Sequence, residues 1–173
     1  MNIRHFACWL LGAWIAGSLF MILVATQNFR SVDRLLAAPG GAGARIDQMG
    51  RAEARTLLRY QVSEQNRWYF ETWETIQLGL GATLVAVAWP GLSERRVFAV
   101  LAAAMFALLL LERFYLTPEI VRLGRMIDFT PLATPSPERE IFWRFHTAYS
   151  TVELMKLALG VFLSARLIFG RTR

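Results

Sequence analysis

A chain of 173 residues has the length of one domain, but 55% of its residues are hydrophobic and its mean hydropathy is +0.36. This composition is too apolar for an ordinary soluble globule. The net charge of +6 does not indicate a nucleic-acid partner, because the basic residues flank apolar runs and form no basic, aromatic-interleaved domain. We therefore expect one integral membrane domain over residues 1–173, with the lipid bilayer as its main partner.

Four apolar runs along the chain are long enough to cross a bilayer. An α-helix rises about 1.5 Å per residue, so about 20 residues cross a hydrocarbon core of about 30 Å. The predicted spans are residues 6–26, 71–90, 96–116 and 145–169. The predicted fold class is therefore an all-α membrane protein, a four-transmembrane-helix up-and-down bundle.

The first and fourth spans each need a further argument. Residues 6–26 exceed the apolar region of a signal peptide, and Arg4 is the only charged side chain before them, so a retained anchor is favoured. In the fourth span, Glu153 and Lys156 each cost about 2.5–3.5 kcal/mol near the membrane centre. This span needs polar partners on neighbouring helices. The Ser-Pro-Glu sequence at 136–138 predicts the start of its helix, which would be longer than the bilayer is thick.

Residues 37–66 form the predicted connection between the first two spans. The Ala, Pro and Gly residues at 37–43 predict a flexible break, and an extra amphipathic helix is expected from Arg45 towards Arg67. A basic stripe recurs on this helix every four residues. It consists of Arg51, Arg55 and Arg59. The stripe either binds anionic lipid headgroups or is a solvated helix face, and the solvated face is favoured.

The arginine distribution bears on location and orientation. Every basic residue except Lys156 is arginine, which fits a GC-rich bacterial genome and hence a bacterial inner membrane. Short segments on the side of the termini contain Arg4, Arg95, Arg96, Arg166, Arg171 and Arg173. The two longer loops hold about twice as many arginines over more residues. We expect both termini on the cytoplasmic side.

Polar residues gather where four span ends meet on one side of the membrane. At 100° per residue, the polar positions of the second span fall within about 60° and those of the fourth within about 120°. We expect these two stripes to face each other and to line a one-sided polar pocket. The candidate lining residues are Glu71, Glu74, Gln77, Arg113, His146, Tyr149, Ser150, Glu153 and Lys156.

Some of these charges have a structural explanation as well. Where helix ends protrude from the bilayer, Glu71, Glu74 and Glu112 would simply lie at the headgroup level, and this interpretation is favoured for those three. For Glu153 and Lys156, deeper in the fourth span, a functional role is favoured. An internal salt bridge that only stabilises the bundle would also explain this last pair.

Metal and cofactor sites are disfavoured. Glu71, Glu74, His146 and Glu153 could supply three carboxylates and an imidazole, but the Glu-x-x-His motif of di-iron bundles is absent from the sequence. Haem is disfavoured because His5 and His146 would lie at opposite membrane faces. No nucleotide-binding glycine pattern and no nucleophile elbow occurs. We expect no cofactor, and an enzyme is the minority interpretation.

Small residues spaced four apart predict where helices approach closely. These seams are Gly12 with Ala16, Ala13 with Gly17, and Ala99, Ala103 and Ala107. Such seams let helix backbones touch in a membrane. Internal packing is favoured over contacts between copies of the chain.

Several motifs resemble the transmembrane protein 205-like family, a four-span membrane domain of unknown function. The motifs are Gly-Ala-Trp at 12–14 with Phe-Arg-Ser at 29–31, Tyr-Leu-Thr-Pro at 115–118, and the aromatic-rich run at 142–146 that ends in His146 and precedes Ser150. The resemblance implies a four-span bundle and directs attention to His146 and Ser150. The first loop is longer here, and Glu153 stands where an uncharged amide is expected. The family brings no activity.

The leading hypothesis is a non-enzymatic membrane protein whose polar pocket binds a small polar or cationic ligand or a protein partner. The first alternative is a proton-coupled small-molecule or ion transporter in which Glu153 and His146 exchange protons. The second alternative is a metal-dependent membrane enzyme. In a purely structural alternative, the bundle is a scaffold, a subunit or a homo-oligomer, and its polar residues only hold the helices together.

Overall fold

The computed structural model describes residues 3–88, 96–131 and 134–170, and these ranges contain helices and no strand. The elements in chain order are α1 (Ile3–Ala37), α2 (Gly41–Met49), α3 (Arg51–Ala88), α4 (Arg96–Leu111), the π-helical turn η2 (Glu112–Leu116), α5 (Thr117–Ile127) and α6 (Pro137–Phe169). Because α4, η2 and α5 follow one another without a break, the described chain forms five separate helices. The predicted all-α class is confirmed.

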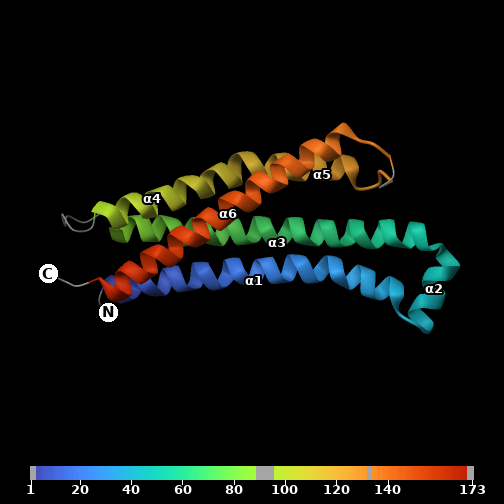
Figure 1. The fold of residues 1–173 in the computed structure, drawn as a ribbon, viewed down its shortest axis with the longest axis horizontal. Helices are drawn as coiled ribbons and strands as arrows, with labels where there is room; N and C mark the ends of the chain where they lie inside the picture. Colours follow the sequence, from blue (N-terminus) through green and yellow to red (C-terminus); the bar gives the residue numbers. More distant parts are fainter. Residues whose placement is uncertain (1–2, 89–95, 132–133, 171–173) are drawn as a thin grey trace.

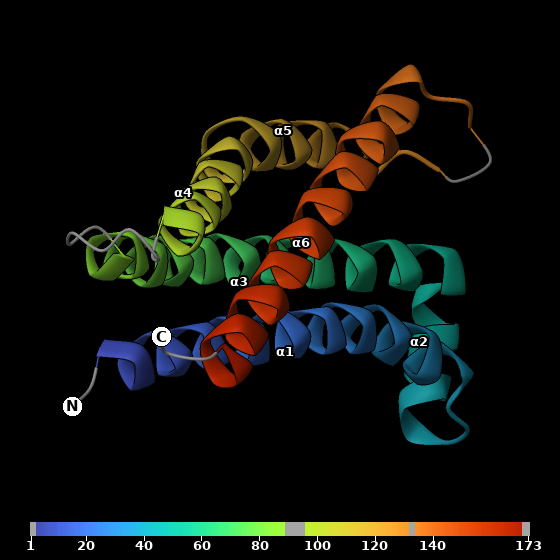
Figure 2. The same cartoon turned by 60° about the vertical axis from the view of Figure 1, so that its left-hand side comes forward.

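The long helices run alternately in opposite directions (Figure 1). α1 and α3 lie side by side, and α4 packs against α3. α6 crosses the others obliquely, with its first half against α5 and its second half against α1 (Figure 2). One end of the molecule, the terminal end, therefore holds the start of α1, the end of α3, the start of α4 and the end of α6. The opposite end, the α2 end, holds α2 and the start of α6.

Local sequence explains where several helices begin and end. The Ser136 hydroxyl accepts a hydrogen bond from the Arg139 backbone N–H at 3.3 Å and caps α6, and Pro137 occupies its first turn. This is the helix start that residues 136–138 predicted. The hydrogen bond from Ser136 lowers the pKa of Glu138 in the same turn. At the terminal end, Arg4 donates to the Ile168 carbonyl at 3.1 Å and joins α1 to α6.

The connection predicted over residues 37–66 is shorter in the structure. α1 continues past residue 26 to its end at Ala37, and α3 runs from its start to Ala88 as one helix. Gly40 and Gly50 bound the nine-residue α2 with φ angles of +93° and +88°, a backbone region that glycine adopts freely because it has no Cβ. The extra helix is therefore α2, and the single amphipathic helix expected from Arg45 towards Arg67 is divided at Gly50.

The basic stripe on the first part of α3 has partners within the chain. Arg51 pairs with Asp47 at 2.6 Å, and Arg55 pairs with Asp33 at 3.4 Å. The Arg59 guanidinium lies over the Phe29 ring, 5.5 Å from its centroid. Arg51 and Arg55 nevertheless stay 63% and 49% exposed, so both the solvated face and headgroup binding stay predictions.

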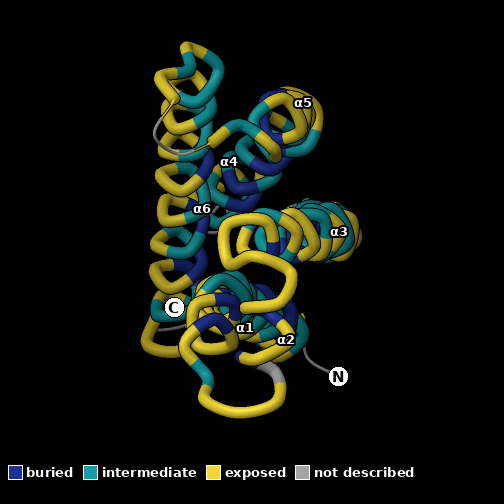
Figure 3. Tube along the Cα trace, turned by 90° about the vertical axis from the view of Figure 1, so that its right-hand side faces the viewer, coloured by how far each residue is buried: buried dark blue, intermediate teal, exposed yellow. Residues whose placement is uncertain are grey.

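Two apolar clusters lie at the two ends of the molecule. The cluster at the terminal end draws on α1, α3, α4 and α6 and consists of Ala7, Leu10, Leu11, Trp14, Leu84, Ala88, Ala102, Met105, Leu109 and Leu163. The cluster at the α2 end joins α1, α2 and α3 and consists of Val32, Leu36, Ile46, Ala54 and Val62. Buried positions occur along the helices where they face one another, and exposed positions cover the outside (Figure 3). Burial of apolar area therefore holds the helices together at both ends, and polar side chains occupy the region between.

The small-residue seams divide into an inward and an outward set. Gly17 of α1 lies directly beneath the Trp73 indole of α3, so this glycine allows a close approach of the two helices. Gly12 and Ala16 are exposed, as are Ala103 and Ala107. The expectation that all three seams pack internally is wrong for these exposed residues. On α1, the Gly12–Ala16 seam lies about 100° around the helix from the Ala13–Gly17 seam, so the two seams cannot both face α3.

Two helices are long and apolar enough to cross a membrane by length and composition. They are α1 over Ile3–Ala37 and the continuous helix Arg96–Ile127. The most apolar stretch of each is only 28% and 22% buried, respectively, inside the molecule. Most of their apolar surface therefore faces outward.

At the α2 end, Arg67 ties α3 to the last turn of α5. Its guanidinium donates to Asp128 Oδ1 at 2.8 Å and to the Glu64 carboxylate. Burial lowers the pKa of Arg67, but the hydrogen bonds and charges of Asp128 and Glu64 outweigh it and place the pKa above its ordinary value. The Arg67 and Asp128 side chains are 12% and 7% exposed, and Arg67 is the recorded donor to the buried Asp128 carboxylate.

We predict that Arg67→Met lowers the free energy of unfolding by about 1–3 kcal/mol, because it leaves the buried Asp128 carboxylate without its donor. Equilibrium unfolding of the purified protein measures this change. Arg125→Met is the matched control: Arg125 faces the same Glu64 at 3.5 Å but is 64% exposed, and exposed ion pairs contribute little. Equal effects of the two substitutions would contradict the bridging role of Arg67.

Candidate functional site

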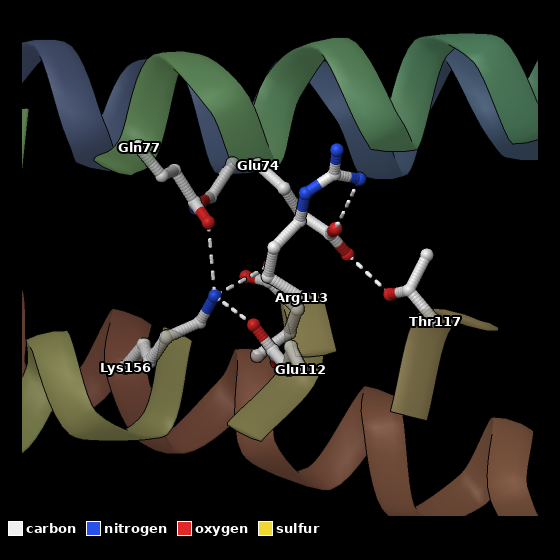
Figure 4. Close-up of polar contacts among 8 residues, drawn as sticks. Glu74, Gln77, Glu112, Arg113, Thr117 and Lys156 are labelled. Atoms are coloured by element: carbon white, nitrogen blue, oxygen red, sulfur yellow. Dashed lines mark hydrogen bonds and ion pairs between the residues drawn. The ribbon is translucent and has the colours of Figure 1, made fainter. Parts of the chain in front are cut away.

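The centre of the molecule holds a fully buried lysine with three oxygen partners. Lys156 Nζ donates to Gln77 Oε1 at 2.9 Å, to Glu153 Oε1 at 2.9 Å and to Glu112 Oε2 (Figure 4). An ammonium group carries three N–H donors, so all three are used. The side chains of Lys156 and Glu112 are 0% exposed, and that of Glu153 is 15% exposed. We call Lys156, Gln77, Glu112 and Glu153 the lysine cluster.

Four helices contribute to the surroundings of this lysine. Glu153 and Lys156 lie one turn apart on α6, Gln77 comes from α3, and Glu112 begins η2. The Gln77 amide Nε2 donates to Ser18 Oγ of α1 at 3.3 Å, which orients the amide so that its oxygen faces the lysine. The Trp14 ring, also from α1, lies 5.8 Å from Lys156 Nζ. The face of an aromatic ring attracts a cation, so α1 stabilises the buried ammonium as well.

A π-helical turn presents Glu112 to this cluster. The Thr117 N–H donates to the carbonyl of Glu112, five residues back, instead of four as in an α-helix. Pro118 follows directly; it has no N–H, and its ring crowds the carbonyl four residues before it, which favours a local widening of the helix. Such turns are frequent at functional sites.

Glu74 of α3 forms a second carboxylate centre next to the lysine cluster. The Thr117 hydroxyl donates to Glu74 Oε1, and Arg113 lies 3.6 Å from Glu74 Oε2 (Figure 4). Glu74 is 0% exposed, whereas the Arg113 side chain is 32% exposed. The Tyr149 hydroxyl is buried and interacts electrostatically with the carboxylates of Glu74, Glu112 and Glu153. The exposed edge of the whole assembly therefore runs along Arg113 and Glu153.

Several buried polar atoms in this region make no hydrogen bond within the described chain. They are Trp14 Nε1, Trp73 Nε1, Glu74 Oε2, Glu112 Oε1 and Tyr149 OH. Buried polar groups without a partner are rare because each forfeits its hydration. Three of the five belong to two carboxylates and a phenol that lie around one lysine. The site can therefore accept a proton, a water molecule or a polar ligand group.

Of the predicted pocket residues, six gather here and three do not. The six are Glu74, Gln77, Arg113, Tyr149, Glu153 and Lys156. Glu71 is half-buried on α3, and no ion pair or side-chain hydrogen bond joins it to the others among the described residues. His146 stacks on Phe142 with 5.8 Å between ring centroids, and the exposed Ser150 donates to the His146 carbonyl at 2.9 Å. The His-x-x-x-Ser pair is thus a contact within α6.

Sequence reasoning placed Glu112 at the headgroup level, together with Glu74. The structure buries both side chains completely and bonds each to a neighbouring helix. Their depth in a membrane stays a prediction. Ser18 and Thr117 were not identified at all. The only sequence signal for Thr117 is its position next to Pro118 at the end of an apolar run.

The described residues show neither a metal centre at the lysine cluster nor a cavity there among those identified. In residues 3–88, 96–131 and 134–170, no group of three or more His, Cys, Asp or Glu side chains could hold a metal ion. A cavity of about 360 Å³ lies at the α2 end instead. Its lining is mostly apolar and consists of Leu35, Arg45, Ile46, Met49, Ala54, Leu57, Leu58 and Gln61.

Comparison with known proteins returned no match from family models, curated proteins or solved structures. The resemblance to the transmembrane protein 205-like family stays a prediction.

Proposed function

We propose that the chain is an integral membrane protein whose four long helices, α1, α3, α4–α5 and α6, cross the bilayer. The apolar stretches of α1 and of Arg96–Ile127 support this placement, because a core helix of a soluble protein would be mostly buried and these are only 28% and 22% buried. Large apolar side chains also point outward from α6, including Leu154 at 60% exposed and Phe162 at 49%. Contiguous exposed apolar surface of this kind fits lipid.

α3 and α6 carry charges, and the proposed placement requires these charges to lie inside the bundle. Their polar side chains Gln77, Glu153 and Lys156 bond one another inside the bundle. At about 1.5 Å per residue, Lys156 lies about 20 Å from the end of α6. The lysine cluster would therefore lie inside a hydrocarbon core of about 30 Å that starts at the terminal end. Intramembrane ionisable residues normally face the bundle interior and pair with one another.

The remaining helix length lies outside the membrane in this arrangement. α1 has 35 residues and is about 52 Å long, about 20 Å more than the hydrocarbon core is thick. The excess places α2 and the Arg67–Asp128 ion pair in water, where charges are hydrated. We keep the bacterial inner membrane as a proposal from the arginine bias of the sequence, and the cytoplasmic orientation of the termini as a prediction from arginine counts.

The function that we propose is the binding of a small polar or cationic ligand at the lysine cluster and Glu74, reached from the α2 end past Glu153 and Arg113. The observation that carries this proposal is Glu112 Oε1, which is buried without a hydrogen bond to any described residue, next to the buried Glu74 and Tyr149 oxygens, whose recorded partners are each other and Arg113. Such an oxygen is an acceptor available to an incoming donor. Because Glu153 and Arg113 are the partly exposed members, they would be the first to meet a ligand.

Native mass spectrometry of protein released from a mild detergent tests this function. We expect the wild type to carry a small bound mass that Glu153→Gln loses, because the substitution removes the outer carboxylate of the site. The matched control is Glu119→Gln, the same chemical change on α5, where Glu119 pairs with the exposed Arg122. The control should retain the mass. Bare wild-type protein, or equal loss in both variants, would contradict the binding function.

A further inference from the structure

The lysine cluster and Glu74 hold more acidic than basic groups. Lys156 and Arg113 supply two positive charges, and Glu74, Glu112 and Glu153 supply three carboxylates. With every group ionised, the assembly has a net charge of −1. A carboxylate without compensation in an apolar interior costs several kcal/mol, so a buried group takes up a proton instead.

The uncompensated negative charge lies on the two carboxyl groups around Lys156, those of Glu112 and Glu153. Glu74 has its own cation, Arg113 at 3.6 Å, and its own hydroxyl donor, Thr117. Lys156, in contrast, is shared by two carboxylates, Glu112 and Glu153, and by the Gln77 amide. One ammonium neutralises only one of these two carboxylates.

Burial decides which of the two carboxyl groups is neutral. The Glu153 side chain is 15% exposed and can keep water on one oxygen, whereas Glu112 is 0% exposed. Glu112 Oε1 is buried without a hydrogen bond to any described residue, and among those residues Lys156 is the one donor to Glu112 Oε2. Hydrogen bonds stabilise a charged carboxylate and burial destabilises it, so Glu112 is the less stable anion.

A proton satisfies this site better than a metal cation does. The Lys156 ammonium already occupies the position between Glu112 and Glu153 and would repel a second cation there. A proton needs no coordination shell and turns Glu112 into a donor as well as an acceptor. The charged and titratable groups that face it are Glu74 from α3, Tyr149, Glu153 and Lys156 from α6, and Arg113 next to it in η2.

We propose that Glu112 is a proton-binding site, which holds one exchangeable proton at neutral pH and releases it towards the α2 end when a cationic ligand binds on the partly exposed side of Glu153, away from Lys156, and supplies the missing positive charge. The inference rests on the membrane placement and the ligand site proposed above. On release, the O–H bond of Glu112 breaks, the proton passes by Glu153 to water, and the ligand restores neutrality. Proton and ligand thus compete for one negative charge, which is the basis of proton-coupled exchange.

Infrared spectroscopy tests the proton site on full-length protein that has been dialysed until native mass spectrometry shows no bound mass. The protein is measured in an ester-free detergent, because lipid esters absorb in the same region as a protonated carboxyl group. A protonated carboxyl group has a C=O stretching band that ionised carboxylates lack. We expect the wild type to show this band at neutral pH, Glu112→Gln to lose it, and Glu119→Gln to retain it. Absence of the band in the wild type, or its loss in Glu153→Gln but not in Glu112→Gln, would overturn the assignment.

The thermal stability of Glu112→Gln gives a second, independent answer. A glutamine amide resembles a neutral carboxyl group in size and polarity, so the variant should unfold at the wild-type temperature at neutral pH. A variant that unfolds much earlier or fails to fold would show that Glu112 is an anion in the native protein, and would overturn the proposal.

The two proposals fail in different ways. A carboxyl band that depends on Glu112, in a protein that carries no bound mass, would leave the proton site intact and contradict the ligand site. A bound mass that Glu153→Gln removes, in a protein that shows no carboxyl band, would support the ligand site and contradict the proton site.

Discussion

Replacing Lys156 with methionine should lower the free energy of unfolding by about 3–5 kcal/mol, because removal of one partner leaves a buried charge uncompensated. Lys156 is 0% exposed and donates to three side chains from three elements, α3, η2 and α6. Methionine fills a similar volume, so the loss reports the charge and its hydrogen bonds rather than a cavity. Equilibrium unfolding in mixed micelles measures the change.

The double variant Lys156→Met, Glu153→Gln separates charge from packing. It removes one positive and one negative group together and should recover much of the lost stability. Arg122→Met is the matched control for loss of a cation, because Arg122 pairs with Glu119 on the exposed face of α5 and should have little effect. A double variant as unstable as the sum of the single variants would contradict the Lys156–Glu153 pairing.

Gly17→Ala is expected to destabilise the protein by about 1–3 kcal/mol through overpacking. A Cβ at this position would overlap the Trp73 indole, which is buried at 8% exposed between α1 and α3. Because a tryptophan ring is rigid, the two helices must move apart. Thermal unfolding of the purified protein measures the effect.

Gly12→Ala provides the matched control on the same helix. No atom lies within 4 Å of a Cβ built at Gly12, and alanine is the better helix former. We expect unchanged or slightly higher stability for this variant. If Gly12→Ala destabilised the protein as much as Gly17→Ala, the outward seam would be an interface between copies of the chain, and the assignment of Gly12 to the outer face would be incomplete.

The helical fold follows from features that the sequence displays directly. Apolar runs and the Ser-Pro-Glu start of α6 predicted the long helices, since capping and hydrophobic periodicity act locally. The positions of the helix ends were harder to predict from the sequence. α1 continues to Ala37 because helix formation does not stop where hydrophobicity stops: Gln27 and Asn28 continue the helix, and the Asn28 amide donates to Asn66 of α3 at 2.7 Å.

The lysine cluster was predictable only in part. Residue spacing placed Glu74 with Gln77 and Glu153 with Lys156, because positions three apart share a helix face. Glu112 was not predicted to line the pocket, since its position at the end of an apolar run resembles a headgroup position, and the π-helical turn that follows it has no simple sequence signature. His146 belonged to the same predicted stripe, but it lies about 15 Å along α6 from Lys156, and its ring stacks on Phe142 of the same helix.

Accessibility of single cysteines tests the central claim, that charge-bearing α3 and α6 cross the membrane at the depth of the lysine cluster. In a Cys8→Ala background, cysteines replace Ile76 of α3, 50% exposed, or Leu154 of α6, 60% exposed, with the exposed Ala52 as the control. The readout is reaction with a membrane-impermeant maleimide in bilayers opened on both sides. Our account predicts that the Ala52 position reacts and that the Ile76 and Leu154 positions react only after denaturation. Rapid reaction of both in the native membrane would contradict it.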